Sequence, residues 1–449
     1  MDHRAPPSDA AREGDAGDGE IPGVDLPREA GPLDGEPGDT AALDAVDAAP
    51  EDGAPEVLSP WPVPWLDEEP SPICPEAAAE TEWFQFLDNL CDEKVWPEDT
   101  DRDRACPVAD DSPFMALQDG TVVEYRPSSE PVVWDTTSLG GLLPEGMRMV
   151  VILVKRVNGV PHYRYLSNGT HDVAMQPWST TKILAAANAA ATLRIQSGYT
   201  VGLTATAGAY PVGDLVTSLC NYDHEPFSSN ALGAWFHNVG GRAKANGLIH
   251  DLWLERPPVE TFGGNYGEAA PGIPYTFVEP GGASVTVTPD TASGFSNNLS
   301  LFTLAEALKR LALHREEPTQ RLPGIQWPDL RVLFFGAEGS VPYGPWGGMS
   351  ADTAIYLQAG HDIGYIAERS LGRWRILSKL GLGTQYQFIH LGYACWPALL
   401  PDGQPVPGLG REFIVAGWLA QGGGTWTGRD RLFAKAYRRV ILRIVDGRL

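Results

Sequence analysis

The segment Met175–Leu184 opens a helix whose first turns are almost entirely Ala, Ile and Leu. We expect this helix to be buried and to end near Ser197-Gly198, where glycine suits a helix C-terminus. It begins with Ser179 and Lys182, whose three-residue spacing places them on one face, one turn apart. A lysine in such a helix indicates a functional role, because burying an ammonium group costs free energy and lowers the pKa of the group.

This serine and lysine have a chemical use. If Ser179 begins the helix, its hydroxyl lies at the positive end of the helix dipole. An uncharged Lys182 amine one turn away can accept the serine proton, so that a weak nucleophile becomes a competent one. The alternative interpretation is an ordinary N-cap serine next to a solvated lysine.

Two further motifs follow in the chain. Ser228-Ser229-Asn230 precedes a short helix that ends at Gly240-Gly241, and Lys379-Leu380-Gly381 lies within Arg375–Gly383. Together, S-x-x-K, S-x-N and K-x-G resemble the serine β-lactamase and D-Ala-D-Ala peptidase (penicillin-binding protein) superfamily. The resemblance covers roughly the C-terminal two thirds of the chain.

The resemblance implies roles in catalysis for four residues. Ser179 would be the nucleophile and Lys182 its base. Ser228 would carry a proton to the leaving group, and Asn230 would hold Lys182 and the substrate amide.

The resemblance also implies a substrate-binding strand. Lys379 would recognise a substrate carboxylate, and Gly381 would leave room for the substrate backbone. The backbone N–H groups of Ser179 and Leu382 would form the oxyanion hole, two donors directed at developing negative charge.

Each of the later motifs has a rival. Ser296-Asn297-Asn298 is also S-x-N, but it precedes a helix and is better explained as a loop and cap. His390-Leu391-Gly392 resembles the histidine variant of K-x-G. The fold requires two strands after this motif, which favours Lys379.

The chain departs from the family pattern in two places. Leu380 replaces the usual Ser or Thr, so a hydroxyl that helps to hold the substrate carboxylate is missing. The Glu-x-x-Leu-Asn loop of class A β-lactamases is absent, and the corresponding region offers Glu255, Glu260 and Glu268 instead. Without a dedicated base, an acyl-enzyme would hydrolyse slowly. Trp178 is either a wall of the cleft or a core residue.

The order of elements matches a five-stranded antiparallel sheet with helices on both faces, which is the α+β, β-lactamase/transpeptidase-like architecture that the resemblance implies. A helical subdomain and long inserts at residues 257–300 and 318–365 separate the strands. The expected elements are a hairpin at Met149–Arg156 and His162–Leu166 with an Asn158-Gly159 turn, a helix at Leu301–His314, strands at Arg373–Leu382, Gln385–Trp396 and Glu412–Leu419, and a helix at Arg429–Ile444.

The acidity of the chain is concentrated at its N-terminal end. Residues 1–130 hold 34 acidic and 7 basic side chains, whereas the rest holds 24 and 26. We expect residues 1–60 to be disordered, because they lack the apolar side chains that a core needs. Residues 61–130 would be an acidic, Trp-containing linker with a short helix near Glu82–Leu90, and residues 131–449 the hydrolase domain. The acidic region could bind a basic partner.

Several function classes are disfavoured by the sequence. No basic patch points to nucleic acid, and no run is apolar enough to span a membrane. The five cysteines are widely spaced, so buried free thiols are favoured over disulfides, and no spacing indicates a metal or other cofactor. The first residues lack the apolar segment of a secretory signal, whereas the resemblance implies an extracytoplasmic protein, so the compartment stays open.

The motifs together favour a serine hydrolase that forms a covalent acyl-enzyme on a peptide, β-lactam or ester carbonyl. A peptidase-like or esterase-like role is favoured over an efficient β-lactamase, because the deacylation glutamate is missing. The alternative is a penicillin-binding-like ligand-binding or sensor protein on the same fold, which acylates without turnover or does not react at all. The substrate and the oligomeric state cannot be named from the sequence.

Overall fold

The computed structural model describes residues 94–449 except 223–224, 353, 355 and 359–362. The chain divides into two compact units, Met1–Leu58 and Ser59–Leu449, and the described residues all belong to the second. The helix expected near Glu82–Leu90, and the cysteines Cys74 and Cys91, lie outside the described residues.

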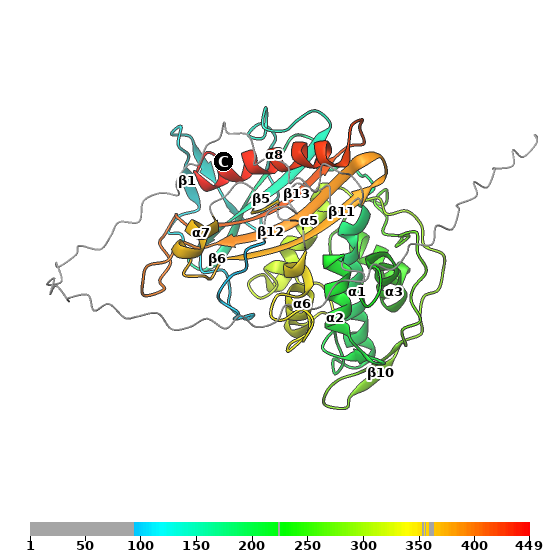
Figure 1. The fold of residues 1–449 in the computed structure, drawn as a ribbon. Coiled ribbons are helices and arrows are strands. Elements are labelled where there is room, and N and C mark those ends of the chain that lie inside the picture. The colour runs from blue at the N-terminus through cyan, green and yellow to red at the C-terminus, as the bar shows by residue number, and fades with distance from the viewer. Residues whose placement is uncertain (1–93, 223–224, 353, 355, 359–362) are drawn as a thin grey trace, which may run out of the picture. The chain divides into compact units, whose positions relative to one another are not determined.

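A mixed sheet of seven strands forms the centre of the second unit (Figure 1). Five long strands pair antiparallel in the order β11-β12-β13-β5-β6, which confirms the α+β fold class and the predicted sheet. Two short strands beyond the prediction, β3 and β4, pair with β6, and β4 runs parallel to it. The bounds are β3 Arg126–Pro127, β4 Trp134–Asp135, β5 Met147–Val157, β6 Val160–Ser167, β11 Arg375–Gly383, β12 Gln387–Trp396 and β13 Arg411–Leu419.

Both faces of this sheet are buried, and successive residues of each strand point to opposite faces. In β13, Ile414 packs against the larger hydrophobic cluster, whereas Phe413 and Val415 pack against the second one. The predicted hairpin is confirmed, because Asn158 and Gly159 join β5 and β6 with φ of 52° and 80°. Such left-handed angles suit a two-residue hairpin turn.

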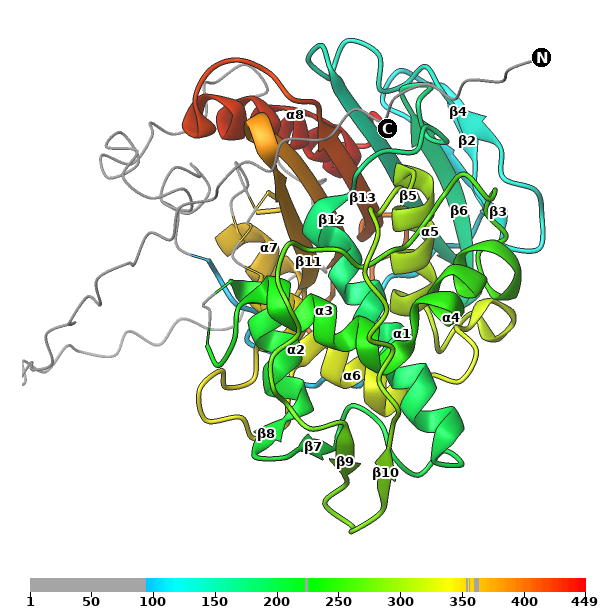
Figure 2. The ribbon, with the colours of Figure 1, turned by 90° about the vertical axis from the view of Figure 1, so that its right-hand side faces the viewer.

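Helices cover the two faces of the sheet (Figures 1 and 2). The predicted C-terminal helix is α8, and it packs with the second cluster. Residues 182–335, here called the helical block, lie between β6 and β11 in the chain and supply most of the larger cluster. The bounds are α1 Lys182–Gln196, α2 Val212–Asn221, α3 Ser229–Gly240, α4 Arg242–Gly247, α5 Leu301–Ala312, α6 Trp327–Phe335, α7 Ile363–Arg369 and α8 Trp426–Val445.

The two predicted inserts contain regular structure of their own. Residues 257–300 contain two strands of a four-stranded sheet with the order β10-β9-β7-β8, and residues 318–365 contain α6. None of the helices in the described part of the chain is long and apolar enough to cross a bilayer. The remaining bounds are β1 Phe114–Ala116, β2 Val122–Glu124, β7 Thr206–Ala207, β8 Tyr210–Pro211, β9 Thr276–Val278 and β10 Ser284–Thr286.

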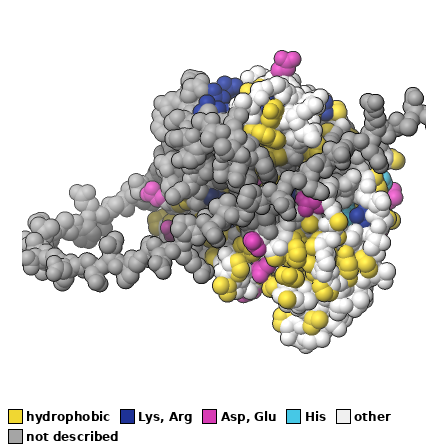
Figure 3. Space-filling view, turned by 45° about the vertical axis from the view of Figure 1, so that its right-hand side comes forward, with side chains coloured by type: hydrophobic (Ala, Val, Ile, Leu, Met, Phe, Trp, Pro, Cys, Tyr) yellow, Lys and Arg dark blue, Asp and Glu magenta, His cyan; other side chains and the backbone are white. Residues whose placement is uncertain are grey.

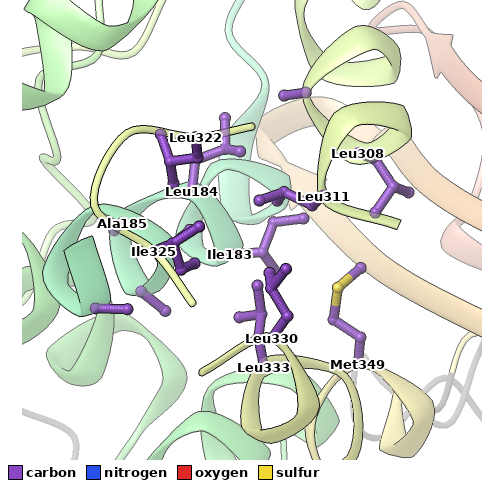
Figure 4. Packing of buried hydrophobic residues seen from close by; sticks show 14 of the residues in the cluster. Ile183, Leu184, Ala185, Leu308, Leu311, Leu322, Ile325, Leu330, Leu333 and Met349 are labelled. Atoms are coloured by element: carbon purple, nitrogen blue, oxygen red, sulfur yellow. The ribbon is translucent and has the colours of Figure 1, made fainter. Parts of the chain in front are cut away.

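Helix α1 is buried along its length, as its composition predicts. Ile183 and Leu184 lie among side chains of α5 and α6, including Leu311 and Leu330 (Figure 4). Each such side chain contributes about 2 kcal/mol on burial. This packing fixes the first turn of α1 and therefore the position of Lys182.

The lower part of the surface in Figure 3 carries mainly apolar and uncharged side chains.

Residues 94–106, here called the strap, pack on the domain although they belong to the acidic N-terminal region. The backbone of Val95 exchanges two hydrogen bonds with the Gln358 amide, at 3.2 and 3.0 Å. Trp96 stacks on Trp346 at 6.1 Å between ring centroids. The Lys94 ammonium donates to the backbone oxygen of Ser350 at 2.7 Å. Side chains of the strap therefore reach the buried region beside β11.

The cysteine prediction was wrong for one pair. Cys106 of the strap and Cys395 of β12 form a disulfide, 289 residues apart in the sequence. Sequence spacing could not indicate this pairing, because only the folded sheet brings the two residues together. The prediction of a buried free thiol is confirmed for Cys220.

Replacing both Cys106 and Cys395 with Ala is expected to lower the free energy of unfolding by about 2–5 kcal/mol, because the bond closes a long loop in the unfolded chain. Urea unfolding of the full chain would measure the loss, with Cys220→Ala as the variant that leaves the disulfide intact. Peptide mapping without reductant should recover Cys106 and Cys395 in one linked fragment, and two free thiols there would contradict the assignment.

Candidate active site

Ser179 lies in a single 3₁₀ turn, Trp178–Thr181, and α1 begins directly after it at Lys182. Trp178 has a left-handed φ of 46°, which is unusual for a bulky residue and typical of constrained sites. Its indole N–H donates to Gln387 at 3.0 Å, and its ring lies against Gly383. The half-buried Trp178 thus anchors the turn that carries Ser179 to the end of β11.

Strand β11 passes close to the backbone of this turn. A Cβ atom on Gly381 would lie 3.0 Å from the Ser179 nitrogen, so glycine permits the approach. The Leu380 oxygen accepts a hydrogen bond from Tyr222 of the helical block, so Leu380 presents its backbone groups at the outer edge. In an antiparallel strand, residue i+2 presents its groups on the same side, which turns the Leu382 N–H outward as well.

Lys182 is fully buried, with 0% of its surface exposed. Its Nζ donates to Asn230 Oδ1 at 2.7 Å and to Ser229 Oγ at 3.0 Å. Burial, reinforced by the nearby Lys379 ammonium, lowers the pKa of Lys182 well below 10.5. Gly233 of α3 makes room for it, because a Cβ there would lie 3.1 Å from Lys182 Cγ. A neutral amine has two N–H groups for these two acceptors and one lone pair left to take a proton.

The two serines of the S-x-N motif have different contacts. Ser228 caps α3 by accepting from the Ala231 N–H at 3.1 Å, and its hydroxyl donates to Glu268. Ser229 is the serine that contacts Lys182, and its own hydroxyl donates to the Leu219 oxygen at 2.7 Å. The structure therefore joins Lys182 to Asn230 and Ser229, and the proton relay through Ser228 stays a prediction.

The three glutamates considered for deacylation lie in different surroundings. Glu260 is fully buried and accepts from Ser300 N and Ser300 Oγ at 3.0 and 3.1 Å, from Thr303 Oγ1, and from Arg256 at 3.0 Å. It therefore stabilises the start of α5. Glu255 is exposed. Glu268 is exposed too, but it interacts electrostatically with Lys182 besides bonding to Ser228.

Lys379 lies on the face of β11 that points to the helical block, and it is fully buried. Its Nζ donates to the backbone oxygens of Leu380 and Cys220 at 3.1 and 3.4 Å. Burial, opposed by the Asp352 carboxylate, lowers its pKa to about 8. Asp352 is itself buried, accepts from Ser378 at 3.0 Å, and has a raised pKa because of burial.

The strap contributes a further buried lysine to this region. Lys94 donates to the Asp352 backbone oxygen, and burial, opposed by the Asp352 carboxylate, lowers its pKa to about 8. Lys94 and Lys379 thus share the buried carboxylate of Asp352 as their electrostatic partner.

Tyr222 is a site residue that the sequence analysis missed. It ends α2 with a left-handed φ of 61°. Its hydroxyl donates to the Leu380 oxygen and is a hydrogen-bond partner of Ser179. Lys379 Nζ lies 3.6 Å from the centre of its ring. Burial raises its pKa well above 10, so the phenol is a neutral group. Its local sequence carries no signal that could have found it.

The rival motifs lie elsewhere. His390 follows the alternation of β12 to the opposite face, where its ring contacts Tyr356 and Tyr437 at 5.2 Å each. Asn297 accepts from the Gly264 N–H at 2.9 Å, as a loop residue would. The Leu380 side chain also points to the second cluster, away from Lys379. Within the described residues, no cluster of three or more His, Cys, Asp or Glu side chains could hold a metal ion.

No family model and no curated protein sequence matches the chain. Several solved structures are similar to it. These are β-lactamases. A variant of the last common ancestor of Gram-negative bacteria class A β-lactamase is 16% identical, covers 68% of this chain and 96% of its own, and has a TM-score of 0.35.

Two further solved structures show the same level of similarity. A β-lactamase from Desulfarculus baarsii is 16% identical, with coverage of 68% and 95% and a TM-score of 0.34. The TLA-3 extended-spectrum β-lactamase is 12% identical, with coverage of 69% and 98% and a TM-score of 0.38. Each match spans nearly the whole solved chain and about two thirds of this one.

Proposed function

We propose that this chain is a serine hydrolase that acts through a covalent acyl-enzyme, with Ser179 as nucleophile and Lys182 as its base. The observation that carries the proposal is the fully buried Lys182, with a lowered pKa and both of its neutral-amine N–H groups engaged by Asn230 and Ser229. Its lone pair is then available for the proton of a serine one turn away.

In the proposed reaction, Ser179 Oγ attacks the substrate carbonyl while its proton passes to Lys182. The developing oxyanion is stabilised by the backbone N–H groups of Ser179 and Leu382, whose approach is permitted by Gly381. The proton then goes to the leaving group, with Ser228 as the proposed relay, and the carbonyl–leaving-group bond breaks. Water finally hydrolyses the acyl-enzyme. Peptides of the D-Ala-D-Ala type, β-lactams and simple esters or amides share this carbonyl chemistry.

A second candidate is a binding or sensor protein on the same fold that acylates without turnover. It is favoured by the contacts of Glu260. Its carboxylate accepts hydrogen bonds from Ser300 and Thr303 at the start of α5 and therefore does not serve as a base for the deacylating water. Both candidates predict a reactive Ser179, and they differ in the lifetime of the adduct.

Intact-protein mass spectrometry tests this proposal. Incubation with a fluorophosphonate is expected to add one adduct mass to the wild-type chain and none to Ser179→Ala, and any adduct formed by a reporter penicillin should likewise depend on Ser179. Ser197→Ala is a matched control, since this serine ends α1 at the opposite end from the site. An adduct that decays supports the hydrolase, and a permanent penicillin adduct supports the second candidate. Equal labelling of wild type and Ser179→Ala, or no labelling by either reagent, would reject the nucleophile.

A further inference from the structure

One side chain, Tyr222, lies against the nucleophile and two residues of the substrate-binding strand. Its hydroxyl donates to the Leu380 oxygen on the outer side of β11 and is a hydrogen-bond partner of Ser179. Its ring lies 3.6 Å from Lys379 Nζ and 6.0 Å from Lys182 Nζ. Tyr222 therefore fills the space between the nucleophile and the lysine of the K-x-G motif.

This placement leaves Lys379 without an open side. The Lys379 ammonium donates to the Leu380 and Cys220 oxygens, and the Tyr222 ring covers it, so that none of its surface is exposed. An aromatic face stabilises a desolvated ammonium group by its quadrupole. The ring thus takes the place beside Lys379 that a substrate carboxylate would need.

We propose that Tyr222 is a specificity-determining residue that closes the Lys379 subsite to carboxylates, so that the site takes neutral esters or amides. This inference rests on the proposed function, because it concerns which acyl donors reach Ser179. For a neutral ester, Ser179 Oγ bonds to the carbonyl carbon, the bond to the alcohol breaks, and the alcohol leaves with the serine proton. Lys379 then has no direct contact with the substrate.

The position of Tyr222 indicates that its side chain can be replaced without disrupting the arrangement of the other site residues. It ends α2 rather than lying inside a helix or strand, and the residue as a whole is partly exposed. The anchors of Ser179 and Lys182 are separate, since Trp178 is held by Gln387 and Lys182 by Asn230. Removing the Tyr222 ring should therefore open the Lys379 subsite while leaving the nucleophile and its base in place.

A pair of esters with the same acyl group tests the proposal. Hydrolysis of phenyl acetate and of 3-carboxyphenyl acetate by the full chain would be compared at pH 7, in the wild type and in three variants. The wild type is expected to favour the neutral ester by at least about tenfold in kcat/KM, the order that a desolvated cation–π contact is worth. Tyr222→Phe should keep this preference, because it keeps the ring over Lys379.

The remaining two variants test whether the subsite opens. Tyr222→Ala is expected to raise kcat/KM for the carboxylate ester about tenfold relative to the neutral one. Tyr222→Ala combined with Lys379→Met should lose this gain, since the exposed ammonium that binds the carboxylate is gone. A gain that persists without Lys379 would show a merely wider cleft and would overturn the assignment.

Labelling of Ser179 by a fluorophosphonate shows whether a negative result concerns the role of Tyr222 alone or the proposed function as a whole. A labelled wild type that hydrolyses the carboxylate ester as well as the neutral one overturns the role of Tyr222 and leaves the proposed function standing. A loss of both esterase activities by more than about 100-fold in Tyr222→Phe would place the phenol in the chemistry instead. An unlabelled, inactive wild type rejects both proposals. If Tyr222→Ala alone is unlabelled, the hydrolysis of the two esters by the wild type and by Tyr222→Phe decides. A preference for the neutral ester in both supports the role of Tyr222, and equal hydrolysis of the two esters overturns it.

Discussion

Replacing Lys182 with Met is expected to slow the labelling of Ser179 by a fluorophosphonate by about 10²- to 10⁴-fold, the usual contribution of a positioned general base. Lys182→Arg should lose as much, although it keeps a positive charge, because a guanidinium group does not give up its proton in proteins. The two variants together separate proton transfer from simple electrostatics. The measurement is the rate of adduct formation by intact mass.

The pH dependence of labelling follows from the same amine. The base form of Lys182 is the neutral one, and burial lowers its pKa well below 10.5. The labelling rate should therefore rise with pH through this lowered pKa and then stay level. Lys379 behaves in the opposite sense, since its ammonium is lost above about pH 8 and any contact with an anionic substrate fades there.

A matched control is available in Lys244→Met. Lys244 of α4 is also partly buried, with a pKa lowered to about 8 by burial, and it donates to Thr192 Oγ1 at 2.8 Å. It has no contact with Ser179 among the described interactions. Lys244→Met should label as fast as the wild type. A Lys182→Met variant that also labels at the wild-type rate would remove Lys182 from the mechanism.

The elements that the sequence predicted well are those whose signal is local. The alternation of apolar residues along Met147–Val157 and the Asn158-Gly159 turn are sufficient to specify a hairpin. The apolar composition of α1 indicated burial on all sides, which the structure confirms. Only the start of α1 differs, because Ser179 lies in a 3₁₀ turn before the helix rather than in its first turn.

The features that the sequence could not give depend on contacts between distant segments. Lys94 and Asp352 meet across more than 250 residues, and so do Cys106 and Cys395. The choice between Ser228 and Ser229 depends on where α3 begins, a difference of one residue that propensity does not resolve. Lys182 and Asn230, by contrast, were joined through the three-motif pattern and are in contact.

Removal of Glu260 should affect stability rather than chemistry. Glu260→Ala leaves the Ser300 N–H, the hydroxyls of Ser300 and Thr303, and one side of Arg256 without their shared acceptor in a fully buried place. Breaking one partner of such a network typically costs about 3 kcal/mol or more. Urea unfolding should show this loss, whereas Glu268→Ala, at an exposed position, should stay within about 0.5 kcal/mol of the wild type.

The rate at which the Ser179 adduct decays is expected to depend on Glu268 rather than on Glu260. Glu268 bonds to Ser228 and interacts with Lys182, so it is the glutamate placed to assist an attacking water. Glu268→Ala should slow the loss of the acyl adduct on Ser179 by up to about 10²-fold, and Glu260→Ala, measured well below its unfolding midpoint, should leave it unchanged. A Glu260→Ala variant that keeps wild-type stability but slows decay would reverse the two assignments. Because stability and decay are measured separately, a loss of the fold cannot be mistaken for a loss of the base.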